Sequence, residues 1–134
     1  MISIPLKRPV PGAINSVYGL RRFFNKKPKS PHRGLDFRGK RGTPVKACAS
    51  GKVILVGNHF FAGKSVYVDH GSGIISCYFH LNSIRTQTNQ KLSKGDVLGT
   101  IGSSGRVTGP HLHLGFYILG HAIDPAPLFS KKFL

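Results

Sequence analysis

Apolar and polar positions alternate along several short runs of the chain, most clearly in GPHLHLGF at residues 109–116. Successive side chains of a strand point to opposite faces, so His111 and His113 are predicted to share one face. The other face then carries three apolar side chains, Leu112, Leu114 and Phe116. A face this regular belongs against a core, which leaves two imidazoles on the opposite side of the strand.

Two β-hairpins are predicted from similar runs. TPVKACAS at 43–50 reaches Gly51-Lys52 and continues into VILVG, which is typical of a hairpin. SVYVDH at 65–70 and IISCYFHL at 74–81 are joined by Gly-Ser-Gly and predict a second one.

The alternation within 74–81 predicts which side chains of this strand share a face. The apolar face is expected to carry Ile75, Cys77, Phe79 and Leu81. Tyr78 and His80 are expected on the other face. Tyr78 could either contact a substrate there or pack in the core. A third histidine would then project away from an apolar stripe.

The remaining segments are turns, loops and short strands. Residues 93–102 predict a turn leading into a strand, 103–110 a glycine-rich loop, and 122–129 an irregular tail that could pack on a β-barrel or sandwich. Residues 1–31 are expected to be extended and loop-like, because they contain five prolines.

Composition supports a mainly β, antiparallel protein with little helix. The chain has 134 residues, which suits one domain, and is 40% hydrophobic, which is too apolar for a disordered chain. Its 17 glycines and 9 prolines are scattered throughout and leave helices little room. Cys48 and Cys77 match no zinc-ribbon spacing, so we expect small buried residues and leave a disulfide open.

The charge balance predicts an anionic partner or a solvated basic loop. The net charge is +16, there is no Glu, and nine of the twenty cations lie between Arg21 and Arg41. Such a field attracts nucleic acid, anionic membranes or an anionic cell wall. No apolar run approaches a membrane span, and the N-terminus lacks the apolar stretch of about 7–15 residues that marks a signal peptide.

Five residues of this chain are candidate metal ligands on a β scaffold. Zinc takes His nitrogens and Asp oxygens at about 2.0–2.2 Å, and three protein ligands leave a position for water. The candidates are His32, Asp36, His80, His111 and His113. Pro31 and Gly34 favour a loop entering a strand around the first two candidates, so these would come from separate segments.

Together these motifs resemble the lysostaphin/LytM-type zinc metallopeptidases, which cut peptide cross-links in bacterial cell walls. The resemblance covers residues 18–125 and includes the Gly-rich approach and a closing Asp124-Pro125. Three family motifs fall on this chain: HxxxD at His32 and Asp36, YxHL at Tyr78 to Leu81, and HxH at His111 and His113.

The resemblance implies a compact LytM or duplicated-hybrid-motif-like domain and one Zn²⁺ per chain. It implies that His32, Asp36 and His113 hold the metal and that His80 and His111 are catalytic. We therefore expect a single metallopeptidase domain over 1–134, with an N-terminal segment and basic loop at 1–31 and a catalytic core at 32–125. With no Glu in the chain, a histidine pair replaces a glutamate base, and which histidine takes the proton stays open.

The implied substrate is the stem peptide of peptidoglycan, with the D-Ala–diaminopimelate cross-link favoured over a glycine bridge. Anionic wall polymers would bind the basic segment, and the location would be periplasmic or in the cell envelope although no signal peptide is visible. We expect a monomer with no nucleic-acid partner.

Three other functions are weighed against this enzyme. The first is a zinc-binding but inactive wall-binding or amidase-activator module. The presence of all five motif residues in this chain argues against it. A nucleic-acid binder is suggested by charge alone, and no interleaving of aromatic and basic residues supports it. KGDVLGTIG resembles lipoyl or biotinyl carriers, yet no lysine at a tight hairpin tip accompanies it.

Overall fold

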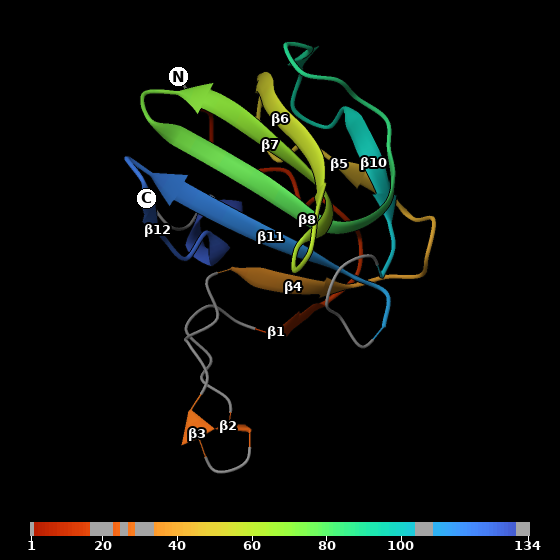
Figure 1. Ribbon diagram of the computed structural model, residues 1–134. Helices are drawn as coiled ribbons and strands as arrows, with labels where there is room; N and C mark the ends of the chain where they lie inside the picture. The colour runs from red at the N-terminus through yellow and green to blue at the C-terminus, as the bar shows by residue number, and fades with distance from the viewer. Residues whose placement is uncertain (1, 17–22, 25–26, 29–33, 104–108, 131–134) are drawn as a thin grey trace.

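A ten-stranded antiparallel sheet makes up most of the protein (Figure 1). The computed structural model describes residues 2–16, 23–24, 27–28, 34–103 and 109–130. Its elements in chain order are β1 (Ile14–Ser16), β2 (Phe23–Phe24), β3 (Lys27–Pro28), β4 (Leu35–Arg38), β5 (Pro44–Lys46), β6 (Gly51–His59), β7 (Gly63–Gly71), β8 (Ile74–Ile84), β9 (Lys91–Leu92), β10 (Val97–Ile101), β11 (His111–Ile118), β12 (His121–Ala122) and the 3₁₀ helix η1 (Ala126–Phe129).

The order of the strands confirms the predicted mainly β, antiparallel fold. The main path runs β1-β4-β11-β8-β7-β6-β9, while β10 pairs with both β5 and β8, and β12 pairs with β11. β2 and β3 form a separate two-stranded sheet. The long strands β7, β8 and β11 lie side by side in the middle of the path, so residues far apart in the chain share one surface (Figure 1).

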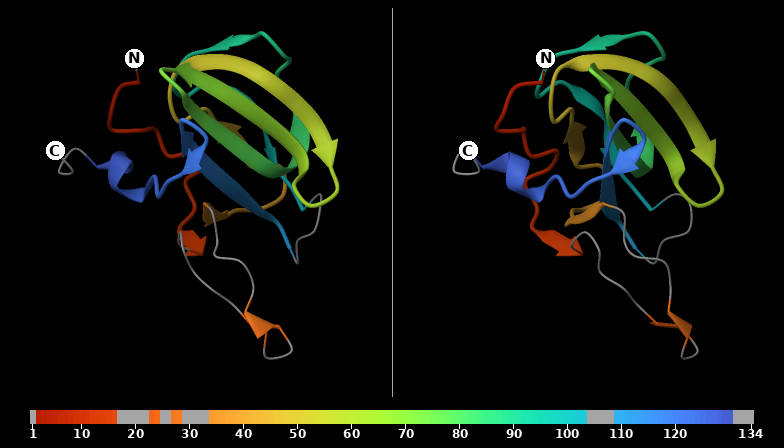
Figure 2. Two further views of the ribbon diagram at one scale, coloured as in Figure 1. Left: turned by 60° about the vertical axis from the view of Figure 1, so that its left-hand side comes forward. Right: turned by 90° about the vertical axis from the view of Figure 1, so that its left-hand side faces the viewer.

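One hydrophobic core lies on one side of these central strands. It contains Tyr78, Phe37, Phe116 and the leucines of β11, all at most 1% exposed. The N-terminal segment and the C-terminal tail cover the same side (Figure 2), where Leu6 N–H donates to the Leu128 carbonyl at 2.8 Å. Leu128 and Phe129 pack against the core, as predicted for the tail.

The predicted hairpin over 43–57 is wrong. β5 pairs with β10, and β6 pairs with β7 and β9. Gly51 is therefore not a turn residue but a point of close approach: a Cβ there would lie 2.6 Å from the Asp69 carbonyl oxygen. The backbone N–H groups between β5 and β6 donate hydrogen bonds to other parts of the chain. Ala47 N–H donates to the Asp96 carbonyl oxygen, and Cys48 N–H donates to the Tyr78 hydroxyl.

The second hairpin is confirmed, because β7 and β8 pair antiparallel across a short turn at Ser72 and Gly73. The predicted faces of β8 are wrong. Tyr78 and Leu81 both lie fully buried in the core cluster, whereas Phe79 stacks beside His113 on the other side of the sheet. Strict alternation would have separated Tyr78 from Leu81.

A β-bulge explains this reversal. Along β7 the partners step from Lys64 to Val66, while along β8 they step from Leu81 to Tyr78, so β8 has an extra residue here. His80 has φ +65°, a left-handed conformation that is uncommon outside glycine. The hydrophobic pattern does not reveal such an insertion, which changes the face of every residue beyond it.

Other predictions have mixed outcomes. The turn and strand over 93–102 are confirmed by β10, and both cysteines are buried and free. Burial raises the pKa of the Cys77 thiol to about 12.

The segment 1–31 contains β1, β2 and β3, and most of the loop 103–110 lies outside the described residues. Within the described ranges there is no helix of the length and apolarity needed to cross a bilayer.

Candidate active site

Two neighbouring strands place an acid beside the histidine pair. β4 pairs with β11 in a register that sets Asp36 directly opposite His113. His111 and His113 are partly exposed, while Leu112 and Leu114 are fully buried in the core. The alternation predicted for β11 is confirmed, and the neighbouring strand β4 supplies a carboxylate to the face that carries the imidazoles.

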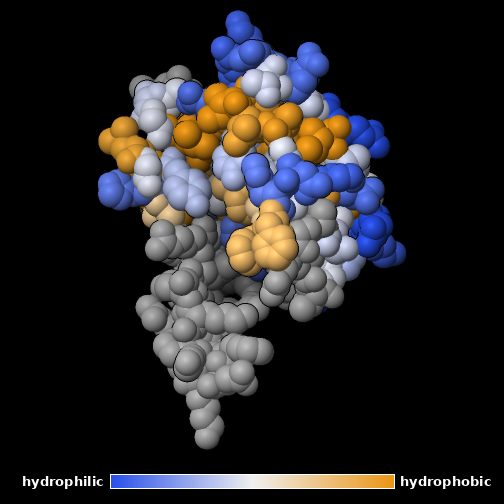
Figure 3. Space-filling model, viewed as in Figure 1, coloured by the Kyte–Doolittle hydropathy of each residue, from blue (hydrophilic) through white to orange (hydrophobic). Residues whose placement is uncertain are grey.

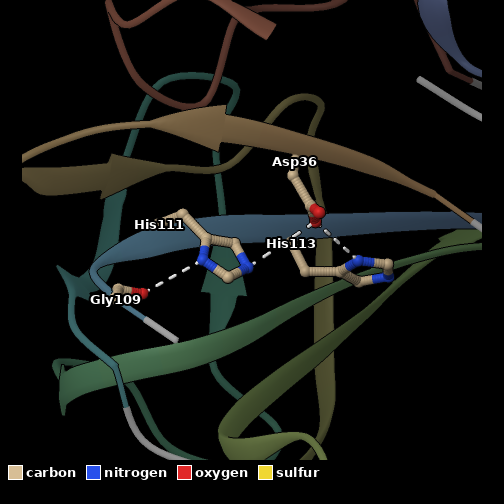
Figure 4. Close-up of polar contacts among 4 residues, drawn as sticks. All are labelled: Asp36, Gly109, His111 and His113. Atoms are coloured by element: carbon tan, nitrogen blue, oxygen red, sulfur yellow. Dashed lines mark hydrogen bonds and ion pairs between the residues drawn. The ribbon is translucent and has the colours of Figure 1, made fainter. Parts of the chain in front are cut away.

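The Asp36 carboxylate lies between the two histidines (Figure 4). Its Oδ1 atom is 3.0 Å from Nδ1 of His113 and 3.8 Å from Nε2 of His111. The three side chains are 15%, 15% and 20% exposed for Asp36, His113 and His111, so each is largely buried but keeps some exposed surface.

A backbone carbonyl determines the tautomer of His111. Nδ1 of His111 lies 3.1 Å from the carbonyl oxygen of Gly109 (Figure 4). A carbonyl only accepts hydrogen bonds, so Nδ1 carries the hydrogen and Nε2 keeps its lone pair in the neutral ring. The nitrogen that faces Asp36 is therefore the basic one.

The bulge in β8 brings His80 to the same group. Its ring centroid is 5.1 Å from that of His111 and 6.3 Å from that of His113, and its side chain is 8% exposed. Its backbone is held on both sides: His80 N–H donates to the Ala62 carbonyl, and Gly102 N–H donates to the His80 carbonyl. A bulge beside a site that re-aims one side chain is a common device in β proteins.

Apolar packing and a glycine fix the ring of His113. Phe79 stacks on it with centroids 5.1 Å apart and an interplanar angle of 11°. On another side, a Cβ at Gly34 would lie 2.7 Å from Nε2 of His113 and 2.4 Å from the Leu114 carbonyl oxygen. Only glycine leaves room for this ring at position 34.

The described part of the site fits a zinc ion. Two ligand atoms at about 2.0–2.1 Å in a tetrahedral shell lie roughly 3.3 Å apart, and Asp36 Oδ1 and His113 Nδ1 are 3.0 Å apart. One carboxylate oxygen with one imidazole nitrogen is a donor set that zinc prefers. The third predicted ligand, His32, lies outside the described residues, and within the described ranges no three His, Cys, Asp or Glu side chains are placed so that together they could hold one metal ion.

The remaining histidines and acids lie apart from this group. His70 is buried, with Nδ1 donating to the Ser50 carbonyl at 2.7 Å and Nε2 2.7 Å from Ser76 Oγ, which confirms its structural role. Burial lowers the pKa of His70. The other two histidines of the chain match none of the site positions, as predicted: His59 and His121.

Three aspartates confirm their predicted turn and cap roles. Asp69 accepts from Gly71 N–H, Asp96 from Ser93 N–H, and Asp124 from Ala126 N–H, with distances of 2.8, 2.8 and 3.0 Å. Of the four acids in the chain, only Asp36 therefore remains for chemistry.

Tyr78 does not contact the site. Its ring is fully buried, and its hydroxyl accepts from Cys48 N–H at 3.0 Å and lies 2.9 Å from Ser76 Oγ. The sequence left open whether Tyr78 contacts a substrate or packs in the core, and the structure places it in the core. Two aromatic neighbours of the site were not anticipated, Phe61 and Phe79.

Comparison with known proteins connects this arrangement to a family. The sequence profile of peptidase family M23 matches residues 30–125, which include all the candidate site residues. The chain belongs to peptidase family M23. The predicted resemblance to lysostaphin/LytM-type proteins is thereby confirmed.

Relatives and solved structures of the M23 family are similar over most of this chain. The peptidoglycan DD-endopeptidase ShyA of Vibrio cholerae is 40% identical over 95 residues, which are 71% of this chain and 22% of ShyA. A zinc containing peptidase from Vibrio cholerae superposes with a TM-score of 0.84 at 30% identity, covering 94% of this chain and 40% of that one. The catalytic domain of lysostaphin from Staphylococcus simulans gives 0.78 at 30% identity, covering 89% and 93%.

This chain covers very different shares of ShyA and of the lysostaphin catalytic domain. The chain spans about a fifth of the length of ShyA, but it matches nearly all of the lysostaphin catalytic domain. The shared part thus corresponds to a region within ShyA and to nearly the whole of the lysostaphin catalytic domain.

Proposed function

We propose that this M23 domain is a zinc-dependent endopeptidase that hydrolyses peptide cross-links of bacterial peptidoglycan. The observation that carries the proposal is the convergence of Asp36, His80, His111 and His113 on one face of the sheet, although they come from β4, β8 and β11. The name of ShyA, a peptidoglycan DD-endopeptidase, supports the substrate class. The bond would be the D-Ala–diaminopimelate cross-link.

The metal would be held by His32, Asp36 and His113. The similarity to a structure described as a zinc containing peptidase supports zinc as the ion, one per chain. Bound there, zinc supplies the Lewis acidity that makes water more acidic and polarises the scissile carbonyl.

His111 is suited to act as the general base. Its Nε2 lone pair faces the side on which Asp36 lies, and its Nδ1–H is held by the Gly109 carbonyl. In the reaction, Nε2 accepts a proton from the attacking water, and the Gly109 carbonyl stabilises the imidazolium that results. The same nitrogen then returns the proton to the amine that leaves when the C–N bond breaks.

His80 is suited to stabilise the oxyanion. It approaches from β8 with its ring 5.1 Å from that of His111, and its backbone is fixed by hydrogen bonds to Ala62 and Gly102. A donor that is already oriented before the reaction stabilises developing negative charge without a cost of reorganisation. The two histidines therefore take different roles although they lie side by side.

Other parts of the proposal concern the surroundings. The basic segment Arg21–Arg41, five of whose nine cations lie outside the described residues, would bind anionic wall polymers. The domain would work in the periplasm or cell envelope, as a monomer and without a nucleic-acid partner.

The proposal is tested with defined cross-linked muropeptide dimers and four variants. The wild type should bind about one zinc per chain and split the dimer at the D-Ala–diaminopimelate bond, as measured by elemental analysis and by mass spectrometry of the products. Asp36→Ala and His113→Ala should lose the zinc. His80→Ala and His111→Ala should keep it and lose activity by about 10²–10⁴-fold.

Two outcomes would contradict these assignments. Full zinc occupancy in both Asp36→Ala and His113→Ala would overturn the ligand set, and loss of zinc from His80→Ala would overturn its catalytic role. A wild type that binds zinc and wall sacculi but releases no peptide would instead support the inactive binding module.

A further inference from the structure

The tip of the hairpin between β6 and β7 is unusually apolar. Turn tips normally carry Gly, Asn, Asp or Ser, but this one presents Phe60 and Phe61, which are 70% and 68% exposed. Their rings pack edge to face with centroids 4.8 Å apart. In Figure 3 a hydrophobic band crosses the face of the sheet, and at the place of the β6–β7 turn a second hydrophobic protrusion projects below it, with hydrophilic residues between the two. An exposed aromatic pair of this kind indicates a binding role.

This tip is held against the candidate active site. The Ala62 carbonyl, one residue beyond Phe61, accepts the hydrogen bond from His80 N–H at 2.8 Å. The β6–β7 ladder continues to His59 and Gly63, directly at the turn, so the tip is supported from both strands. The position of Phe61 is thereby coupled to the bulge that places His80.

A small pocket lies between the tip and the histidines. It has a volume of about 240 Å³ and is lined by Phe61, Ala62, Phe79, His80 and His113. Whole small-molecule ligands occupy pockets of about 300–1,000 Å³, so this one suits a single side chain. Among the described residues that line the pocket none is an acid, a lysine or an arginine, and two are phenylalanines, so the side chain that fits is small and apolar.

We propose that Phe61 and Phe79 form a specificity subsite that takes the small apolar side chain of the residue next to the scissile bond, and that Phe61 limits its size. This inference rests on the proposed function, because the pocket shares His80 and His113 with the candidate active site. In the D-Ala–diaminopimelate cross-link, the small apolar side chain next to the scissile bond is the methyl group of D-alanine. Phe60, which is equally exposed but is not part of the pocket wall, has no such role.

The test compares substrates within each enzyme variant. Zinc-loaded wild type, Phe61→Ala and Phe60→Ala are given three cross-linked dimers, whose residue next to the scissile bond is D-alanine, glycine or D-norvaline. The ratio of kcat/KM values for two substrates of one variant does not depend on how much of that variant is folded. Partial misfolding therefore cannot imitate a change in specificity.

For the wild type we expect D-alanine to be preferred to glycine by roughly tenfold, since one methyl group in an apolar pocket is worth about 10–200-fold. In Phe61→Ala the preference for D-alanine over glycine should fall towards one, and D-norvaline should improve relative to D-alanine because the pocket is wider. Phe60→Ala should keep the wild-type ratios within about twofold.

The outcomes separate this inference from the proposed function. If the wild type cleaves none of the dimers, the proposed function itself fails. If the wild type cleaves the dimers but does not distinguish them, or if Phe61→Ala keeps the wild-type ratios, the peptidase stands and the subsite is overturned. The subsite also fails if Phe60→Ala changes the ratios as much as Phe61→Ala does.

Discussion

Replacing Gly34 with alanine should weaken zinc binding although it removes no ligand. A Cβ at this position would lie 2.7 Å from Nε2 of His113, about 0.7 Å short of the 3.4 Å at which ordinary contact begins. It would lie even closer, at 2.4 Å, to the Leu114 carbonyl oxygen, which is part of the β11 backbone and cannot rotate away. The His113 ring and its strand must therefore move.

The magnitude follows from how little displacement a metal site tolerates. Ligand distances at a zinc site are held to within about 0.2 Å, and a functional group must be placed within about 0.5 Å of its working position. Phe79 stacks on one face of the His113 ring, so the ring cannot shift freely in that direction. We expect zinc affinity to fall by roughly 10–100-fold, as when a partner that orients a ligand is lost, and the free energy of unfolding to fall by about 1–3 kcal/mol.

The assay is competition for zinc with a chromophoric chelator, alongside urea unfolding of the metal-free protein. Gly109→Ala is the matched control, because this glycine precedes the same histidine pair and a Cβ there would lie within 4 Å of no atom in the described part of the chain. The control should bind zinc as the wild type does. If Gly34→Ala binds zinc as tightly as the control, either His113 is not a ligand or its ring does not occupy the position that the packing assigns, and the reasoning is refuted.

Two further predictions concern the buried polar chain that links His70, Ser76, Tyr78 and Cys48 on the core side of the sheet. Tyr78→Phe keeps the ring but leaves Cys48 N–H without its acceptor, so urea unfolding should show a loss of about 1–3 kcal/mol; an unchanged midpoint would show that this hydrogen bond contributes nothing. Because burial lowers the pKa of His70, the unfolded chain binds the proton more readily. The free energy of unfolding should therefore fall as the pH drops below about 6.5, and His70→Gln should make that fall smaller; an equally steep fall in the variant would exclude His70 as a cause.

Much of the site could be predicted from local sequence. The alternation in β11 placed His111 and His113 together on one face, because a strand has a period of two wherever its ladder is regular. The turn around Gly-Ser-Gly gave the β7–β8 pairing, because a short turn leaves two adjacent strands few other partners. The motifs also singled out Asp36 and His80, whose types are suited to a metal and to proton transfer.

The errors arose where distant segments compete for the same backbone groups. A hairpin over 43–57 satisfied the local pattern, but β5 found its partner in β10, about fifty residues away, and β6 paired with β7 and β9. Pairing energy is gained across the whole sheet, so a locally acceptable turn gives way when a distant strand fits better.

The sequence by itself determined the residue types available for catalysis: four aspartates, of which Asp36 alone follows a histidine at HxxxD spacing, no glutamate, and histidines spaced so that one strand presents two of them to the same side. Only the tertiary structure decided how they meet. The β4–β11 register set Asp36 against His113, and the bulge turned His80 towards them while sending Tyr78 into the core. The Phe61 tip came to lie over the same pocket because the β6–β7 hairpin folds back to His80. Register and bulges depend on hydrogen bonds between strands that are remote in the chain, and for that reason no local pattern encodes them.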